Sequence, residues 1–237
     1  MSQAVAKRSA KSAAMLRAGM TGRDLMGGTR GMRAAGRAYL PKMPQESEEG
    51  WQERLAASWL FNGYRKTVRD MVGRVFDKPV ELVEGPSAAE EWEPNIDLAG
   101  RDLSTFAKDV FTAGLHDGIA WVLVDAPART GEETRAQAAE QNLRPYLNVL
   151  TIEDVLGWQA RSINNVMTLT QFRILEAVQV EDPEDEFAEA EVAQVRVLDR
   201  TEAGVQVRLY RQQPNSEQWV LYQEPTFTGL PEISVVP

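Results

Sequence analysis

Residues 102–125, DLSTFAKDVFTAGLHDGIAWVLVD, decide the fold class, because they predict a helix that leads directly into a strand. Asp102 or Ser104 is a suitable N-cap, and apolar residues then recur at helical spacing until Gly118, a residue type that commonly ends helices. The next six residues, 119–124, form an unbroken apolar run of strand length. We therefore expect a central strand covered on both faces, with the preceding helix packed beside its sheet.

A longer helix is predicted on the N-terminal side of this stretch. Ser47 followed by Glu48 and Glu49 is a good helix start, since its hydroxyl can cap and the carboxylates lie at the positive end of the helix dipole. Apolar residues then recur every three or four positions, at Trp51, Leu55, Trp59, Leu60, Tyr64, Val68, Met71, Val72 and Val75. Pro79 predicts the end of a single continuous helix near residue 77.

The C-terminal half is predicted to be mostly β-structure. Residues 126–143 are polar and predict a surface insertion with one short helix. Candidate strands follow, with turn-prone segments between several of them, at residues 144–151, 157–161, 166–180, 192–199, 204–211, 218–223 and 233–236. This pattern is typical of an antiparallel meander. The sequence therefore predicts an α+β fold with N-terminal helices packed on a mixed, mainly antiparallel β-sheet region.

One segment of this half, residues 181–191, is strongly acidic. Its charges are expected to prevent pairing with a sheet, so the simplest interpretation is an exposed hairpin loop. The spacing of its acids lacks the turn glycine and the ligand order of a calcium loop.

Composition indicates a packed protein with an uneven charge distribution. The 237 residues are 43% apolar and 26% charged, which excludes a disordered or fibrous chain. Residues 1–42 hold nine basic residues and one acid, so the rest of the chain carries −17 within a net charge of −9. We expect two parts, a basic flexible arm at residues 1–42 and an α+β domain at residues 43–237.

The basic arm has three open interpretations: a solvated leader, a nucleic-acid contact, or a contact with an acidic neighbouring copy. Its glycines, six between residues 19 and 36, are too dense to predict one stable helix. The candidates for partner or DNA contact are Arg17, Arg23, Arg30, Arg33 and Arg37.

The sequence predicts no catalytic, cofactor or metal site. There is no cysteine and one histidine, and the glycine-rich arm lacks the Gly-Lys-Ser/Thr ending of a phosphate loop. Four acids near strands, Asp125, Glu153, Asp154 and Glu176, could be arranged as nuclease carboxylates, but no strand offers the Asp/Glu-x-Lys pattern that such a site needs. The apolar stretches are too short to cross a bilayer, so we expect a protein made in a reducing cytoplasm.

The predicted long helix carries more aromatic area than a lone surface helix requires. Its rings either fill an intrachain core or cover a neighbouring subunit. The residues concerned are Trp51, Trp59, Phe61 and Tyr64.

Three phrases in order resemble a family of tailed-phage portal proteins that was long described as a domain of unknown function. They are GTRGMRAAGRAYLPKMPQESEEGWQERLAASWLFNGYRKTVRDMVGRVFDKP at 28–79, EPNIDLAGRDLSTFAKDVFTAGLHDGIAWVLVDAP at 93–127 and RPYLNVLTIEDVLGWQ at 144–159. No single phrase is specific, but their shared order makes chance similarity a poor explanation. The family usually continues beyond the equivalent of Pro237, so the resemblance implies an N-terminal half with a truncated C-terminus.

The resemblance implies a structural subunit and transfers no active site. Portal proteins form a homo-oligomeric ring, commonly of twelve subunits, at one capsid vertex, through which double-stranded DNA is packaged and ejected. The implied partners are the major capsid protein, the terminase motor and the head–tail adaptor, and the implied location is the virion, after assembly in the host cytoplasm. Residues 43–237 would be mostly wing, since tunnel-lining residues would lie beyond residue 237. The alternative function is a DNA-binding protein that uses its basic arm.

Overall fold

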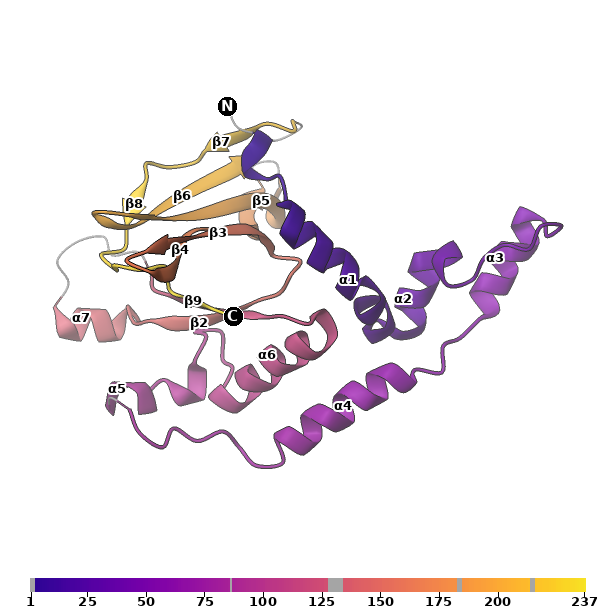
Figure 1. The fold of residues 1–237 in the computed structure, drawn as a ribbon, viewed down its shortest axis with the longest axis horizontal. Coiled ribbons are helices and arrows are strands. Elements are labelled where there is room, and N and C mark those ends of the chain that lie inside the picture. Colours follow the sequence, from indigo (N-terminus) through magenta and orange to yellow (C-terminus); the bar gives the residue numbers. More distant parts are fainter. Residues whose placement is uncertain (1–2, 86, 128–133, 183–184, 214–215) are drawn as a thin grey trace. The chain divides into compact units, whose positions relative to one another are not determined.

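A computed structural model describes residues 3–85, 87–127, 134–182, 185–213 and 216–237. The chain forms two compact units, one of Arg17–Ala120 and one that joins Met1–Leu16 to Trp121–Pro237. We call them the helical unit and the sheet unit, after the elements that each contains (Figure 1). This division does not follow the expected boundary at residue 42. Within the described residues, no helix combines the length and the hydropathy that a membrane span needs.

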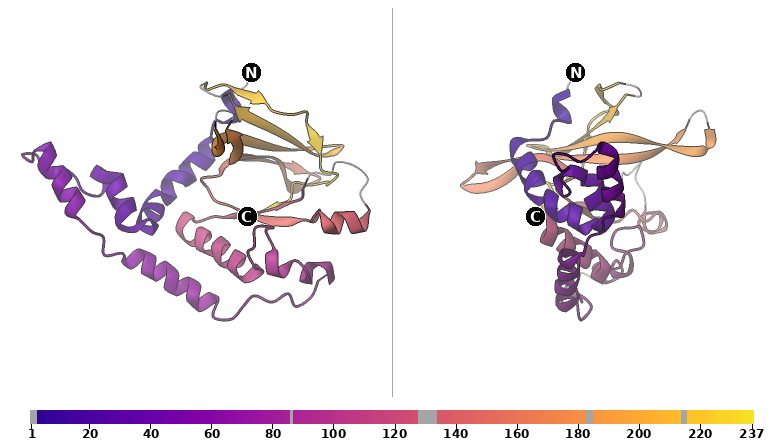
Figure 2. Two further views of the ribbon diagram at one scale, coloured as in Figure 1. Left: turned by 180° about the vertical axis from the view of Figure 1, so that it is seen from behind. Right: turned by 90° about the vertical axis from the view of Figure 1, so that its right-hand side faces the viewer.

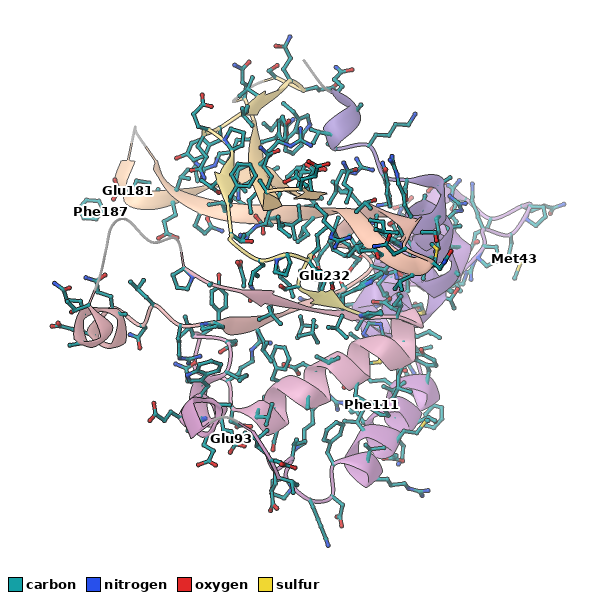
Figure 3. All side chains as sticks on the ribbon, turned by 60° about the vertical axis from the view of Figure 1, so that its left-hand side comes forward. Met43, Glu93, Phe111, Glu181, Phe187 and Glu232 are labelled. Carbon is teal, nitrogen blue, oxygen red and sulfur yellow. The ribbon has the colours of Figure 1, made fainter. Side chains whose placement is uncertain are left out.

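The helical unit contains most of the helices. They are the second part of α1 (Ala10–Met26), α2 (Gly28–Ala35), η2 (Gly36–Ala38), α3 (Glu48–Ala57), α4 (Gly63–Val75), α5 (Ser87–Glu90), η3 (Glu93–Asn95) and α6 (Leu103–Asp117). The prediction for α6 is confirmed: the Asp102 side chain accepts a hydrogen bond from the Thr105 amide, and Gly118 ends the helix in the left-handed conformation. Phe111, which is labelled on α6 in Figure 3, meets Phe76 edge to face, with ring centroids 5.6 Å apart.

The prediction of one continuous helix from residue 48 to residue 77 is wrong. Ser58 takes an extended conformation and ends α3, and the Asn62 side chain caps α4 by accepting a hydrogen bond from the Arg65 amide at 2.9 Å. Apolar periodicity continued across the break because the residues between the helices are also apolar. Two local caps therefore outweigh the periodic pattern.

The glycines of the arm were expected to be too dense for one stable helix, and the arm does contain two helices, α1 and α2, separated at Gly27. The expectation of a flexible arm did not foresee that α1 continues through Gly19 and Gly22. The reason is close packing of α1 against the end of α6. A Cβ on Gly19 would lie 3.1 Å from Asp117 Oδ1, and one on Gly22 would lie 2.7 Å from the His116 carbonyl oxygen. Tertiary contact thus overrides the poor helix propensity of these glycines.

The sheet unit contains two antiparallel sheets, one of three strands and one of six. The three-stranded sheet has the order β2-β1-β9, from β1 (Trp121–Asp125), β2 (Tyr146–Leu150) and β9 (Val235–Val236). The six-stranded sheet has the order β3-β4-β5-β6-β7, with β8 also on β6, from β3 (Val155–Ile163), β4 (Val166–Asp182), β5 (Asp185–Thr201), β6 (Gly204–Gln212), β7 (Trp219–Leu221) and β8 (Thr226–Phe227). The predicted meander is confirmed, and all the described pairings are antiparallel, so the sheets are not mixed.

The two sheets are joined by aromatic contacts. Trp121 of β1 meets Trp158 of β3 and Phe172 of β4 edge to face, with ring centroids 5.5 and 6.1 Å apart. β1 is central, as predicted, but it is not covered on both faces: Trp121 and Leu123 are buried whereas Val124 is exposed. Antiparallel sheets of this kind commonly pack on one face only.

The outer face of the larger sheet is covered by the N-terminal segment, residues 3–16, which contains η1 (Gln3–Val5) and the start of α1. Val5 packs into a cluster with Leu156, Val195 and Val197. The Arg173 guanidinium donates to the carbonyl oxygens of residues 4, 5 and 7, and burial lowers its pKa. Arg8 donates in the other direction, to the carbonyl oxygens of residues 152, 153 and 155.

The acidic segment 181–191 was expected to be an unpaired loop, and this is wrong for the part that the structure describes. Glu181 pairs with Glu189, Val180 with Ala190 and Gln179 with Glu191, so that β4 and β5 continue as a hairpin (Figure 2). Glu189 and Glu191 alternate with Ala188 and Ala190, and this period of two suits a strand with one solvated face. The short helix expected near residues 132–141 is present as α7 (Arg135–Glu140). Helices with antiparallel sheets make the fold class α+β, as predicted.

Candidate interaction surface

Residues 58–62 join α3 to α4, and alternate residues of this segment are fixed to α1 and α2. The Ser58 carbonyl oxygen accepts from Arg33, 3.0 Å from Nε and 2.5 Å from Nη2. The Leu60 amide donates to Thr29 Oγ1 at 3.2 Å, and Asn62 Nδ2 donates to the Leu25 carbonyl oxygen at 2.5 Å. We call residues 58–62 the aromatic connector.

The two residues between these fixed positions point into solvent. Trp59 is 72% exposed and Phe61 is 82% exposed. Residues 58, 60 and 62 are thus each hydrogen-bonded to the helices, and the two residues between them are the ones whose side chains are exposed. Two large aromatic rings are therefore held in water by a segment that is itself anchored.

The other two aromatic candidates lie inside the helical unit. Trp51 is 6% exposed, its Nε1 donates to the Leu40 carbonyl oxygen at 2.8 Å, and Arg37 lies 4.9 Å above its ring. Tyr64 is half-buried, and its hydroxyl would lie 2.9 Å from a Cβ on Gly22. Trp51 is thus packed in an intrachain core, the alternative that the sequence left open, whereas Trp59 and Phe61 are exposed.

Three of the five candidate arginines make contacts within the helical unit. Arg23 forms an ion pair with the buried Asp117 at 2.6 Å, Arg33 holds the aromatic connector, and Arg37 pairs with Glu48 at 2.7 Å. Arg17 and Arg30 are exposed, and neither forms an ion pair with any residue that the structure describes. Arg30 and Arg33 are one helical turn apart on α2, so the connector lies beside a basic helix face.

The four acids considered as nuclease carboxylates have two different structural roles. Asp125 and Glu176 meet on Arg196, with Asp125 Oδ2 2.5 Å from Nη1 and Glu176 Oε1 2.8 Å from Nε. Burial alone would lower the pKa of Arg196, but the charges of Glu176 and Asp125 outweigh it and raise that pKa. Tyr146 donates to Asp125 at 3.2 Å, and burial raises its pKa, assisted by the charge of Asp125. We call Asp125, Glu176 and Arg196 the charged triad.

The remaining two acids lie at a turn and not in the triad. Asp154 Oδ2 accepts from the amide and the hydroxyl of Thr151 at 2.7 and 2.8 Å, and the Glu153 carbonyl oxygen accepts from Arg8. In the part of the chain that the structure describes, no group of three or more His, Cys, Asp or Glu residues is placed to hold a metal ion. These acids thus support the sheets and their turns.

A groove of about 440 Å³ lies between α4 and α6. Its lining includes the apolar side chains Met26, Val68, Val72 and Phe76, together with Arg65, Arg69 and Lys108. Its described lining includes no acid, and Thr112 is the one hydroxyl in it. Its chemistry suits an apolar or anionic contact better than a reaction.

Comparison with known proteins adds no assignment. No protein-family model matches the chain, and no curated protein sequence matches it. The functional reading therefore depends on the residues and their geometry.

Proposed function

We propose that the chain is a structural subunit of a tailed-phage portal ring and acts by assembly and not by catalysis. The observation that carries the proposal is the aromatic connector, in which Trp59 and Phe61 are held outward by three anchored neighbours. The ordered resemblance of residues 28–159 to portal proteins supports the same reading.

A fixed pair of exposed aromatic rings is suited to protein contact. Burying one side chain of this size contributes about 1.5–3 kcal/mol. Because the connector backbone is already held in place, little ordering entropy is lost on binding. Aromatic residues are also the ones that dominate the energy of protein interfaces. An assembling subunit uses such a surface many times, once at each contact around the ring.

In this proposal the copies form a ring, commonly of twelve in the family that the chain resembles, at one vertex of the capsid. The ring contacts the major capsid protein, the terminase motor and the head–tail adaptor, and double-stranded DNA passes through it during packaging and ejection. The chain works in the virion after assembly in the host cytoplasm. In this proposal the chain acts without catalytic residues and needs no cofactor or metal.

Mass photometry and negative-stain imaging test this proposal. The 26.4 kDa chain is expected to form closed rings at micromolar concentration. Replacing both Trp59 and Phe61 with alanine should shift the population toward monomers while leaving the circular dichroism spectrum unchanged. A wild-type chain that stays monomeric at every concentration would refute the ring.

The second candidate function is DNA binding through the basic arm. One observation favours it: the structure brings Trp59 and Phe61 beside Arg33, which is the aromatic and basic mixture that single-stranded nucleic acid prefers. Titration with a labelled oligonucleotide measures it. Affinity that falls steeply with salt and is lost in Arg30→Glu, from a monomeric protein, would favour DNA binding over the ring.

A further inference from the structure

The β4–β5 hairpin extends beyond both of its neighbours in the sheet. The pairing of β3 with β4 reaches only to Ile174, and the pairing of β6 with β5 begins only at Gln194. In the described pairings, no third strand thus lies beside residues 175–182 or 185–193. Figure 2 (right) shows this orange hairpin extending past the rest of the sheet. A two-stranded ribbon is marginally stable in water at best. A projecting hairpin of this length gains stability when a further surface covers it.

One face of this hairpin is acidic. Strand alternation and pairing place five exposed side chains on it, Gln179, Glu181, Phe187, Glu189 and Glu191, which we call the acidic face. Figure 3 places Glu181 and Phe187 near the end of the hairpin, and Phe187 is 92% exposed. Glu181 and Glu189 are directly opposite each other, and like charges in this arrangement destabilise a strand pair. Glu181, Glu189 and Glu191 form no ion pair with a described residue that would offset their negative charge.

The aromatic connector and the adjoining face of α2 have the complementary character. Trp59 and Phe61 supply apolar area, and Arg30 and Arg33 supply positive charge one helical turn apart. The acidic face offers carboxylates and one ring, Phe187, so the two surfaces carry opposite charges and each also carries aromatic area. Opposite charge sets the register of such contacts, and the buried aromatic area supplies most of the affinity.

We propose that the acidic face of one copy docks on the aromatic connector and the α2 arginines of a second copy. The inference deepens the proposed ring and rests on it, because it names the two surfaces that meet. The surfaces are unlike and every copy carries both, so the contact is head-to-tail and can close into a ring. It also gives the acidic segment 181–191 a task.

Because the chain has no cysteine, single introduced cysteines test the contact directly. Ala34 is exposed and lies four residues after Arg30 on α2, and Gln179 is exposed on the acidic face. A disulfide requires the two Cα atoms to come within about 7 Å. Ala34→Cys mixed with Gln179→Cys under mild oxidation should give a mixed dimer on a non-reducing gel. Ser162→Cys is the matched control and should give only background, because Ser162 is exposed on β3, where it pairs with Met167 at the end of β4 far from Gln179.

Charge exchange provides a second measurement that does not depend on disulfide geometry. Arg30→Glu and Glu189→Arg should each weaken self-association, and mixing the two variants should restore it between unlike copies. High salt should weaken the wild-type contact. If the mixture recovers nothing, the two surfaces do not meet.

The outcomes separate this inference from the proposed function. Wild-type rings without the mixed cross-link would overturn the inference and leave the ring. The mixed cross-link without rings would support the contact and overturn the ring, and the absence of both would overturn both. If Arg30→Glu abolishes oligonucleotide binding and leaves self-association unchanged, the surface serves nucleic acid and the inference fails.

Discussion

Replacing Arg196 with methionine should destabilise the sheet unit strongly, because this one side chain neutralises two carboxylates. Asp125 comes from β1 and Glu176 from β4, so the charged triad joins the two sheets. Methionine keeps most of the apolar stem but leaves both acids without their cation. Gln194 would still donate to Glu176 and Tyr146 to Asp125, at 2.8 and 3.2 Å. Those neutral donors cannot replace the charge.

The exposure of the triad sets the magnitude. Removing one partner of a fully buried ion pair costs about 3–5 kcal/mol. The side chains of Arg196, Asp125 and Glu176 are 23%, 19% and 21% exposed, so water relieves part of that cost. We expect a loss of about 2–3 kcal/mol, which corresponds to a fall of roughly 4–12 °C in the melting temperature. Urea unfolding followed by tryptophan fluorescence measures it, since Trp121 and Trp158 lie between the sheets.

Arg200 provides a matched control in the same strand. Its side chain is also 23% exposed, but its partner Glu232 is 3.5 Å away and 68% exposed. Arg200→Met should therefore cost no more than about 1 kcal/mol. Neutralising the whole triad, with Asp125→Asn and Glu176→Gln added to Arg196→Met, should recover most of the loss. Equal urea midpoints for Arg196→Met and Arg200→Met, or no recovery in the triple variant, would show that the electrostatic reasoning is wrong.

Three further predictions concern the helical unit. Gly22→Ala should destabilise the protein although alanine is the better helix former, because its Cβ would lie 2.7 Å from the His116 carbonyl oxygen. Gly73→Ala in α4 meets nothing within 4 Å and should stabilise by about 0.5–1 kcal/mol. If thermal melts show both variants shifted in the same direction, the packing argument is contradicted. Trp51→Ala should cost about 3–5 kcal/mol, while Trp59→Ala should leave the urea midpoint almost unchanged, which would separate the buried ring from the exposed one. Hydrogen bonds from Arg54 and from the Met43 amide lower the pKa of Glu46 from 4.5 to about 2. The ionised Glu46 therefore contributes to folding stability above pH 4.5, and this contribution is lost as the pH falls toward 2. Melting temperatures across that range should fall less in Glu46→Gln than in the wild type, and equal falls would count against this.

Features fixed by local chemistry were predicted well from the sequence. As expected, α6 begins after Asp102 and ends at Gly118, because capping depends on neighbouring backbone groups only. Ser58 and Asn62 are also residue types that cap helices, but the apolar repeat that runs through Trp59 predicts one continuous helix. The break, and with it the exposed pair, could have been found by giving the caps priority.

Features that depend on distant residues were not predictable in the same way. Gly19 and Gly22 indicated an irregular arm until α6 was known to lie against them. Arg196 did leave a signal, since it stands between Val195 and Val197 in an apolar strand, and a buried cation there requires an acidic partner. Strand pairing determines which acids form an ion pair with Arg196, and the sequence alone does not specify that they are Asp125 and Glu176.

The covering of the larger sheet by residues 3–16 imposes an order on synthesis. These residues are translated before the sheet that they cover: Arg173 and Val195, which contact Val5, follow it by more than 160 residues. At about 5–20 residues per second, the early segment waits roughly 10–40 s for its docking face. The contiguous residues 17–120 have all their own contacts available well before then. The helical unit can thus fold while residues 3–16 still lack the sheet on which they dock, and their docking completes the sheet unit.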